Sequence, residues 1–537
     1  MAKIQPPKYP IIYVRGYAGN DEEVEDTVSD PYMGFNLGST KLRTVYTGAT
    51  ERYYFESPLV RLMKDFDYRD VYSSGLDLAA IENLPAGSVK PNSIIIYRYY
   101  DLVSSSFGEG KRASMETFGE GLGKLIEKLR DRICDDDQEE RAKFRVYLVG
   151  HSMGGLVIRC FLQNDEIGNK DMKKLVDKVF TYATPHNGID LEIIGNVPAF
   201  FTRNNADNFN RKRMAIYLNL PHAKDPLKNE DDEAYENVNT LNGKFDPDRF
   251  FCLIGTNSND YLVAKGWSSR VVGPFSDGLV RLNNAFVYGP TGDANRPKRL
   301  APRAYVHRSH SGYFGIVNSE EGFQNLTRFL FGNVRVDGHL DVKDITLPAP
   351  LEKARKSGKQ VRASYRFECI ARVRGVHWDL SRRVTNENSA LFRTYGELFP
   401  ERAQTSDRPN VNRPHLFTAF LSSDAKVVQR RRSLGFTVDL GVLVPDYVVD
   451  GFAWLKDHFP GGYIFRDKIN LEAIPDPAGG GMWKLKYGFD SKTPNRAGPM
   501  AEAEYLDDAA VFFVPIRQSA QPGIEAKLVL TARWWNR

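Results

Sequence analysis

A serine lies between two glycines at the spacing that a catalytic nucleophile needs. Residues 144–159 read FRVYLVGHSMGGLVIR, so Ser152 stands two positions from Gly150 and two from Gly154. An apolar, strand-like run precedes the motif and a helix-like run follows it. A nucleophile on a sharp strand-to-helix turn needs small residues at these positions, because side chains there would collide with neighbouring backbone. The pattern predicts a serine hydroxyl presented for attack on a carbonyl carbon.

With this motif and its setting, the chain resembles the α/β-hydrolase superfamily and, within it, the serine lipases and esterases. Three other segments carry the resemblance: Tyr9–Gly19 (YPIIYVRGYAG), Phe180–Gly188 (FTYATPHNG) and Ser276–Val280 (SDGLV). The first looks like the strand and oxyanion loop of lipases. The second resembles the T-P-H-x-G segment of lipases and GPI inositol-deacylase-like proteins, and the third matches the D-G-L-V of bacterial lipases.

This resemblance implies roles for particular residues. Asp277 of the D-G-L-V segment would be the acid of a catalytic triad, and the backbone N–H groups of Tyr17 and Met153 would form the oxyanion hole. Arg15 stands where lipases usually have a histidine, which bears on the geometry of that loop. Asp190 is an alternative acid, because some lipases place the acid after the earlier strand.

The base must be one of nine histidines. In this fold the triad follows the order Ser, Asp, His along the chain, and a place ahead of the last helix leaves His307 and His310. We expect His310, which lies on the loop immediately before that helix, whereas His307 ends a run that still looks like a strand. His310 would take the proton of Ser152, and Asp277 would orient the imidazole.

A parallel sheet is expected to bring these residues together. Short and almost continuously apolar runs alternate with helical patterns, which is typical of strands covered by helices on both faces. The expected strands are Ile11–Val14, Ser93–Tyr97, Arg145–Val149, Lys178–Tyr182 and Phe250–Ile254. Apolar residues at helical spacing predict a helix over residues 115–133 and a closing helix that follows the cap at residues 318–321 and stops at Gly332.

From about residue 361 the apolar positions recur every second residue, as in Tyr365–Val373, Phe436–Val442 and Ile524–Trp534. This alternation predicts an antiparallel β-sandwich. The expected fold class is therefore an α/β-hydrolase domain followed by an all-β, sandwich-like domain. The expected boundaries are 1–336 for the catalytic domain, with insertions at about 20–91 and 189–247, 337–360 for a linker, and 361–537 for the accessory domain. The later insertion is a candidate lid.

Composition narrows the possible partners. The 537 residues are 42% hydrophobic and 26% charged, which excludes collagen-like, disordered and coiled-coil chains. The net charge of +5 is too balanced to indicate a nucleic-acid binder. Arg366, Arg372, Arg374 and Arg430–Arg432 place positive charge on the C-terminal domain, so contact with an anionic membrane surface is one option.

Metal and cofactor sites are not expected. The cysteines at 134, 160, 252 and 369 are too far apart for a zinc ribbon or a disulfide scaffold. His151 and His186 have no accompanying cluster of further ligands. The N-terminus lacks the apolar segment of a signal peptide, which predicts a cytoplasmic protein or one exported without a cleaved signal, for example as a secretion-system effector.

The expected activity is hydrolysis of carboxylic esters, most of all lipid or phospholipid acyl esters, through an acyl-enzyme on Ser152. Two long insertions could build a deep cleft for a lipid-like or small ester. A thioesterase, an amidase or an acyltransferase would use the same three residues. An inactive hydrolase fold that serves as a binding module is the non-enzymatic alternative.

Overall fold

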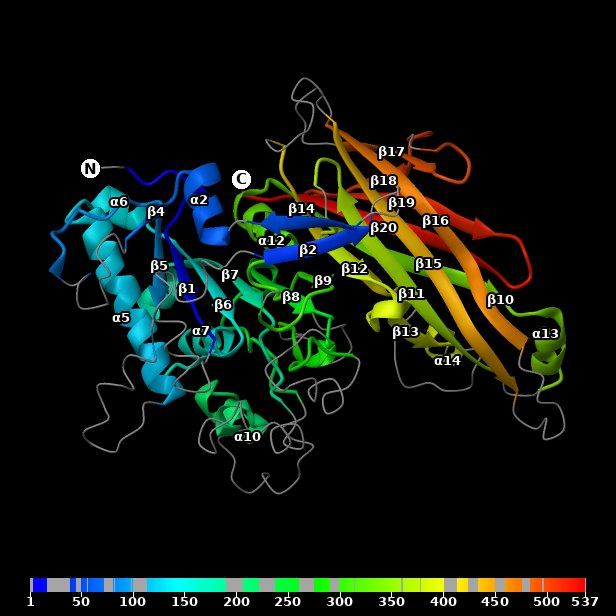
Figure 1. Ribbon diagram of the computed structural model, residues 1–537, viewed down its shortest axis with the longest axis horizontal. Coiled ribbons are helices and arrows are strands. Elements are labelled where there is room, and N and C mark those ends of the chain that lie inside the picture. Colours follow the sequence, from blue (N-terminus) through cyan, green and yellow to red (C-terminus); the bar gives the residue numbers. More distant parts are fainter. Residues whose placement is uncertain are drawn as a thin grey trace. The chain divides into compact units, whose positions relative to one another are not determined.

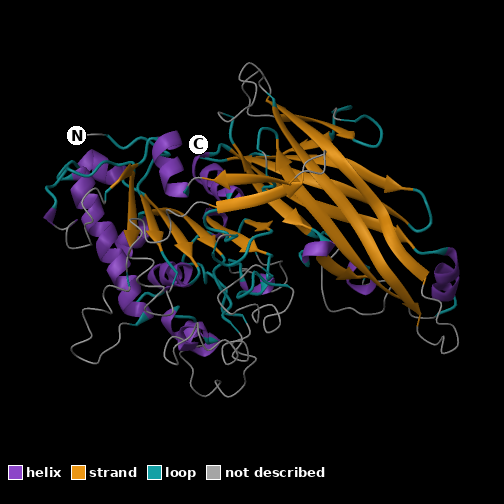
Figure 2. Ribbon diagram, in the orientation of Figure 1, coloured by secondary structure: helices purple, strands orange, loops and turns teal. Residues whose placement is uncertain are grey.

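The computed structural model divides the chain into two compact units (Figures 1 and 2). The first comprises Met1–Arg303 and His307–Leu326, and the second comprises Ala304–Val306 and Thr327–Arg537. The structure describes residues 3–16, 39–44, 50–55, 57–71, 81, 83–97, 99, 114–189, 206–221, 237–259, 275–289, 299–312, 314–358, 361–376, 378–399, 413–423, 433–449, 459–475, 483–494 and 497–536.

A seven-stranded sheet forms the centre of the first unit, in the order β4-β5-β1-β6-β7-β8-β9. Parallel pairing joins β4 to β5, β5 to β1, β1 to β6, β6 to β7 and β7 to β8. The strands are β1 (Ile11–Val14), β4 (Arg69–Asp70), β5 (Ser93–Tyr97), β6 (Val146–His151), β7 (Val176–Tyr182), β8 (Phe250–Gly255) and β9 (Arg303–Val306). The five strands expected from apolar runs are confirmed, and β1, β5 and β8 are buried along their whole length.

Helices flank this sheet (Figure 2). They are α2 (Pro58–Phe66), α5 (Met115–Cys134), α6 (Gln138–Lys143), α7 (Met153–Gln163), α8 (Lys170–Lys174), α10 (Arg211–Tyr217) and α12 (Glu320–Phe331), and a hairpin of β2 (Ser39–Thr44) and β3 (Thr50–Phe55) lies in the first insertion. Both helices predicted from apolar spacing are present. Helix α5 packs closely on α7, because a Cβ at Gly119 would lie 3.1 Å from the backbone nitrogen of Phe161.

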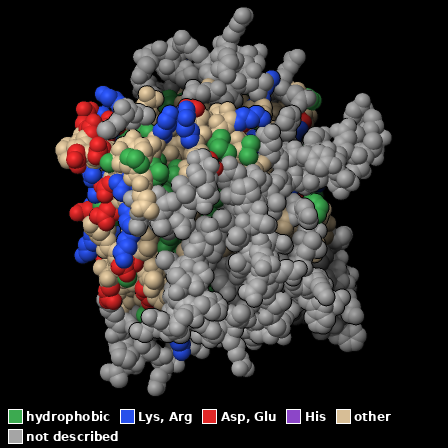
Figure 3. Space-filling view, turned by 60° about the vertical axis from the view of Figure 1, so that its left-hand side comes forward, with side chains coloured by type: hydrophobic (Ala, Val, Ile, Leu, Met, Phe, Trp, Pro, Cys, Tyr) green, Lys and Arg blue, Asp and Glu red, His purple; other side chains and the backbone are tan. Residues whose placement is uncertain are grey.

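The outward side of α5 and α6 carries charges of both signs. Lys124 pairs with Glu120 and Arg141 with Asp131. Figure 3, which brings this side of the unit forward, shows acidic and basic side chains intermixed. Exposed pairs of this kind contribute little to stability, and a mixed surface does not attract polyanions.

The second unit consists of two antiparallel sheets around one apolar core. The first sheet has the order β14 (His415–Leu421), β10 (Val334–Thr346), β20 (Gly523–Trp534), β19 (Ala509–Gln518), β18 (Glu502–Tyr505), and the second has β12 (Ser381–Arg383), β11 (Val361–Val373), β15 (Leu434–Val449), β16 (Phe459–Pro475), β17 (Trp483–Phe489), with β13 (Leu391–Thr394) also on β11. Leu340 and Leu528 of one sheet and Phe367 and Val438 of the other belong to a single buried cluster. The predicted sandwich is confirmed.

The segment predicted to be a linker, residues 337–360, is instead part of the second unit. Strand β10 covers Val334–Thr346, and helix α13 covers Ala349–Lys356. Val334, Val336, Leu340 and Val342 keep a period of two along β10, and the pairing of β10 with β20 shifts register only between Val342 and Asp344. This bulge ends the alternation, so that the next buried apolar residue is Ile345. The linker prediction was wrong, and the first compact unit ends at Leu326 rather than at residue 336.

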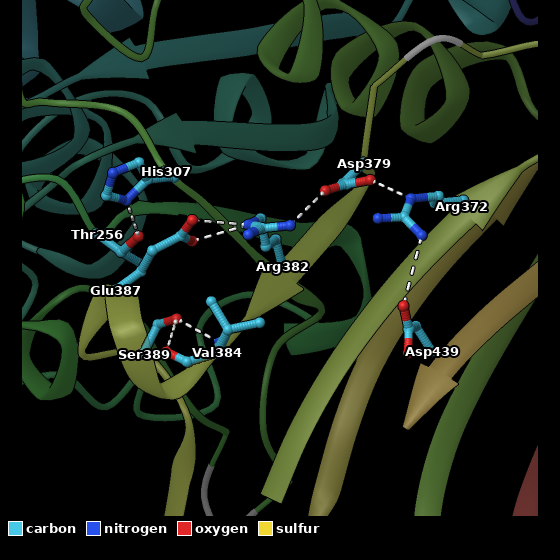
Figure 4. A network of polar contacts seen from close by, with 9 residues as sticks. All are labelled: Thr256, His307, Arg372, Asp379, Arg382, Val384, Glu387, Ser389 and Asp439. Carbon is cyan, nitrogen blue, oxygen red and sulfur yellow. Dashed lines mark hydrogen bonds and ion pairs between the residues drawn. The ribbon is translucent and has the colours of Figure 1, made fainter. Parts of the chain in front are cut away.

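Arginines on β11 and β12 are neutralised within the second unit (Figure 4). The Nε of Arg372 donates to Asp379 at 2.5 Å, and its Nη1 lies 3.7 Å from a carboxylate oxygen of Asp439. Arg382 lies between Asp379 and Glu387, at 3.3 and 2.8 Å. Arg372 is one of the arginines expected to face an anionic surface, and its charge is already balanced. Residues 430–432 lie outside the described residues.

None of the helices in the described part of the chain combines the length and the apolarity that crossing a lipid bilayer requires.

A buried arginine on α7 fixes loops of the first unit. Arg159 donates to the carbonyl oxygens of His186 (2.7 Å), Val238 (2.7 Å) and Thr240 (2.9 Å). Its Nε donates to the side chain of Gln163 at 2.9 Å. Burial lowers the pKa of this guanidinium to about 10, so it remains charged at neutral pH. Because hydrogen bonds from a charged donor are strong in a buried setting, Arg159 ties α7 to two segments far away in sequence.

We expect Arg159→Met to lower the free energy of unfolding of the first unit by about 3 kcal/mol, because two buried carbonyl groups and one partly buried carbonyl group lose a charged donor. Native-state hydrogen exchange of amides in β6 and β7 measures this loss. Arg299→Met is the matched control: Arg299 is 57% exposed and pairs with Asp246 at 3.3 Å. Arg299→Met should lower the free energy of unfolding by less than about 1 kcal/mol. Equal effects of both variants would contradict the assigned role of Arg159.

Candidate active site

Ser152 occupies a strained turn between β6 and α7. Its backbone has φ 51° and ψ −124°, a conformation that L-residues rarely adopt. Strain of this kind costs about 1–3 kcal/mol and persists only where the surroundings enforce it. Two hydrogen bonds enforce it here: the Ser152 N–H donates to the carbonyl of Tyr182 at 3.0 Å, and the Gly155 N–H donates to that of Ser152 at 3.1 Å.

The glycines of the motif allow backbones to approach closely around this turn. A Cβ at Gly150 would lie 2.8 Å from the backbone nitrogen of Gly155. A Cβ at Gly154 would overlap the carbonyl oxygen of Val14, at the end of β1. The steric reason for the glycine spacing around Ser152 therefore holds in the structure, and it involves the neighbouring strand as well as the turn itself.

The three residues predicted as a triad are hydrogen-bonded in series. The Oγ of Ser152 lies 3.0 Å from Nε2 of His310, and Nδ1 of His310 lies 3.0 Å from Oδ2 of Asp277. The residues are 6%, 1% and 1% exposed, in the order Ser152, His310, Asp277. With Nδ1–H donating to the carboxylate, Nε2 is the acceptor for the serine hydroxyl, which is the tautomer that a general base requires.

The carboxylate of Asp277 is fixed by backbone donors. Its Oδ1 accepts from the N–H groups of Leu279 at 3.0 Å and Val280 at 2.8 Å, which leaves Oδ2 for His310. Backbone N–H groups that donate to a carboxylate stabilise its charged form. The D-G-L-V segment thus forms a turn whose own amides hold the aspartate in place.

His307, the alternative base, lies elsewhere. Its Nδ1 is 3.3 Å from the hydroxyl of Thr256 (Figure 4). Asp190, the alternative acid, lies outside the described residues, as does Tyr17, the first of the two predicted oxyanion donors. The structure thus brings His310, and not His307, to Ser152.

Met153, the second predicted donor, is the first residue of α7. Its N–H belongs to the first turn of the helix, where backbone N–H groups lack intrahelical partners and favour an anion. The loop after β1 approaches this place, because a Cβ at Gly16 would lie 3.1 Å from the Cβ of Ser152. Gly16 therefore lies beside the nucleophile.

The Phe180–Gly188 segment contacts the nucleophile through the carbonyl of Tyr182, and its later residues connect loops of the first unit. The side chain of Asn187 accepts from the N–H of Val238 at 2.8 Å, and its backbone N–H donates to the carbonyl of Asn284 at 3.0 Å. Its own carbonyl accepts from Arg211 at 2.9 Å. The T-P-H-N-G motif is therefore hydrogen-bonded to three other segments of the first unit.

A buried ion pair holds the loop that carries His310. Arg308, 1% exposed, donates from Nε and Nη2 to one carboxylate oxygen of Glu321 in α12, at 3.1 and 2.9 Å. Ser309 pairs with the far side of the same loop through its backbone N–H and C=O, with the Ile316 N–H donating to Ser309 at 3.0 Å. This pair is not evident from the sequence, because nothing in the spacing of Arg308 and Glu321 distinguishes them from surface charges.

Among the described residues, no group of three or more His, Cys, Asp or Glu side chains is placed to hold a metal ion. All four cysteines are buried thiols, and burial raises the pKa of Cys134 to about 11. These thiols are therefore protonated at neutral pH and are poor nucleophiles.

Comparison with known proteins points to the same fold. A family model described as the PGAP1-like alpha/beta domain matches residues 113–269, which include Ser152 but neither Asp277 nor His310. The parallel sheet with its flanking helices and this match fit the α/β-hydrolase fold expected for the first unit. A search of the curated proteins returned no match.

Several solved structures are distantly similar. The mature lipase BlEst2 from Bacillus licheniformis is 15% identical, and the match covers 60% of this chain and 90% of the lipase, with a TM-score of 0.29. The phospholipase PlaB from Legionella pneumophila is 14% identical and covers 84% of this chain and 91% of its own, with a TM-score of 0.32. The lin2722 product of Listeria innocua is 12% identical, with coverages of 60% and 94% and a TM-score of 0.24.

We expect Glu321→Gln to lower the free energy of unfolding by about 3 kcal/mol, because it leaves the buried guanidinium of Arg308 without its anion. Thermal and urea unfolding of the single and double variants measure the effect. The double variant Arg308→Met, Glu321→Met should recover much of this loss, since no unpaired charge is left inside. A double variant that is less stable than Glu321→Gln would contradict this account of the pair.

Proposed function

We propose that this protein is a serine hydrolase that cleaves carboxylic esters through an acyl-enzyme on Ser152. The observation that carries the proposal is the continuous hydrogen-bonded series from Ser152 through His310 to Asp277. The fold assignment supports it, because in α/β-hydrolases a serine on a strand-to-helix turn is the nucleophile.

In the first half of the reaction, His310 Nε2 accepts the hydroxyl proton while Ser152 Oγ attacks the carbonyl carbon of the ester. The resulting oxyanion is stabilised by the Met153 N–H and by a donor from the loop after Gly16, for which Tyr17 is our candidate. The tetrahedral intermediate then collapses. The C–O bond to the leaving alcohol breaks, and His310 returns its proton to that alcohol.

In the second half, water replaces the alcohol. His310 takes a proton from the water, the hydroxyl oxygen attacks the acyl carbon, and Ser152 leaves with the proton that His310 returns. Asp277 stabilises the imidazolium in both halves and is not itself protonated. The products are a carboxylic acid and free enzyme.

Lipid or phospholipid acyl esters are the substrate class we favour. The resemblance to lipases suggests them, and an exposed apolar side chain near the acid supports them: Phe275, two residues before Asp277, is 57% exposed. Helix α10, in the insertion predicted as a lid, exposes Ile216 to 53%. Exposed apolar side chains of this size suit contact with an acyl chain or a lipid surface. A thioesterase, an amidase or an acyltransferase would use the same triad, so substrate assays must separate these activities.

We expect the wild-type protein to hydrolyse p-nitrophenyl esters and phospholipid vesicles, and Ser152→Ala to lose at least about 10³-fold in kcat, because the nucleophile is removed. A chain-length series of esters, with thioester and amide analogues, defines the substrate class. Labelling by a fluorophosphonate probe should require Ser152. Equal rates for wild type and Ser152→Ala would exclude the proposed reaction, and hydrolysis of short esters alone would make the protein a carboxylesterase rather than a lipase.

The two histidines near the closing helix provide a separate test of the base. We expect His310→Asn to lower kcat by at least about 10³-fold, because the serine loses its proton acceptor. His307→Asn should keep activity within about threefold, since His307 contacts Thr256 and not Ser152. Rates of ester hydrolysis and of fluorophosphonate labelling measure both effects. Comparable losses in the two variants would contradict the assignment of His310.

A further inference from the structure

His151, the first variable residue of the G-x-S-x-G motif, makes a direct contact with the histidine loop. Its Nε2 lies 3.0 Å from the backbone carbonyl oxygen of His310. A carbonyl oxygen only accepts hydrogen bonds, so Nε2 of His151 must carry the hydrogen. The centroids of the two imidazole rings are 5.1 Å apart, with an angle of 41° between the ring planes. The residue before the nucleophile therefore binds the backbone of the base.

This contact is one of four hydrogen bonds that link His310 to described residues on both sides of it. Two come from the acid: Asp277 Oδ2 accepts from the imidazole at 3.0 Å, and the Asp277 carbonyl accepts from the His310 N–H at 3.0 Å. The other two come from the end of β6: the Oγ of Ser152 meets Nε2 at 3.0 Å, and His151 donates to the carbonyl at 3.0 Å. Asp277 thus binds both the side chain and the backbone of His310. On the other side, Ser152 binds the side chain and His151 binds the backbone.

The charge state of His151 suits this position. Burial lowers its pKa to about 3, and the neighbouring His310 and Arg15 act in the same direction. The ring is therefore neutral at the pH at which His310 would act as a base. A neutral donor holds the loop without opposing the positive charge that His310 gains when it takes the serine proton.

His151 also lies against the loop after β1. A Cβ at Gly16 would be 3.0 Å from Nδ1 of His151, so only a glycine fits beside the ring without a shift. The same side chain thus contacts the segment from which one oxyanion donor is proposed and the segment that carries the base. Both contacts depend on the position of the His151 imidazole ring.

We propose that His151 is a positioning residue, whose hydrogen bond to the His310 carbonyl sets the direction of the His310 imidazole toward Ser152. This inference rests on the proposed function, because it assigns His310 as the base. Proton transfer requires Nε2 and Oγ to stay within hydrogen-bond reach throughout the attack. The backbone bond to His151 limits rotation of the His310 backbone, on which the direction of the ring depends.

The test compares side chains that keep or lose the donor. In His151→Gln the amide nitrogen reaches the place of Nε2, whereas His151→Leu fills space without a donor, and in His151→Asn the amide is one bond too short. We expect His151→Leu and His151→Asn to lower kcat for a p-nitrophenyl ester by about 10- to 100-fold, with KM within about threefold, because a small misplacement of the base affects only the chemical step. His151→Gln should stay within about fivefold of wild type.

Leu129→Ala is the control for loss of stability alone. Leu129 is fully buried in α5, away from the triad, and its truncation should lower the melting temperature without lowering kcat at 25 °C. Wild-type kcat in His151→Leu, with Ser152→Ala inactive, would overturn the inference and leave the proposed function intact. So would a loss in His151→Gln equal to that in His151→Leu. If Ser152→Ala is as active as wild type, the proposed function itself fails.

Discussion

The strained backbone of Ser152 is the feature on which the rest of the site depends. A positive φ at a residue with a side chain is unfavourable, and it persists because β6 and α7 fix the chain on both sides of the turn. The close contact between Gly154 and the carbonyl of Val14 requires β1 to lie beside β6 in its observed register. The position of the hydroxyl is thus decided by the packing of two parallel strands and one helix.

Buried polar groups connect this turn to the loops around it. Arg159 holds segments near residues 186 and 240 through carbonyl oxygens, and Arg308 holds the loop of His310 through Glu321 in α12. Each group is nearly inaccessible to water, so an alternative arrangement would leave a charge or a carbonyl group unpaired inside the protein. These contacts therefore select one loop arrangement over others, which is a different role from the apolar packing that holds the sheet together.

The features that could be predicted from the sequence are those that local patterns encode. Strand runs such as Ser93–Tyr97 and the strand-turn-helix setting of Ser152 depend on neighbouring residues. Chain order narrowed the base to His307 and His310, and the place of His310 on the loop before the closing helix favoured it. The strand β10 was not predicted, although Val334, Val336, Leu340 and Val342 alternate along it. The partners of Arg159 and Arg308 could not be predicted, since pairing across the chain leaves no periodic pattern.

The difference between local patterns and contacts across the chain also explains how the triad forms from residues so far apart. Ser152 and His310 are separated by 158 positions, yet parallel strands place their carboxyl ends at one edge of the sheet, where β6 ends at the nucleophile and β9 leads toward the base. The sheet brings the two loops close together, but it does not determine the exact distance between Ser152 and His310. That final distance is set by hydrogen bonds on both sides of the histidine loop, from Glu321 through Arg308 and from His151 and Asp277 directly to His310. A fold shared by many proteins can therefore carry the residues, whereas the precision of the site depends on contacts particular to this chain.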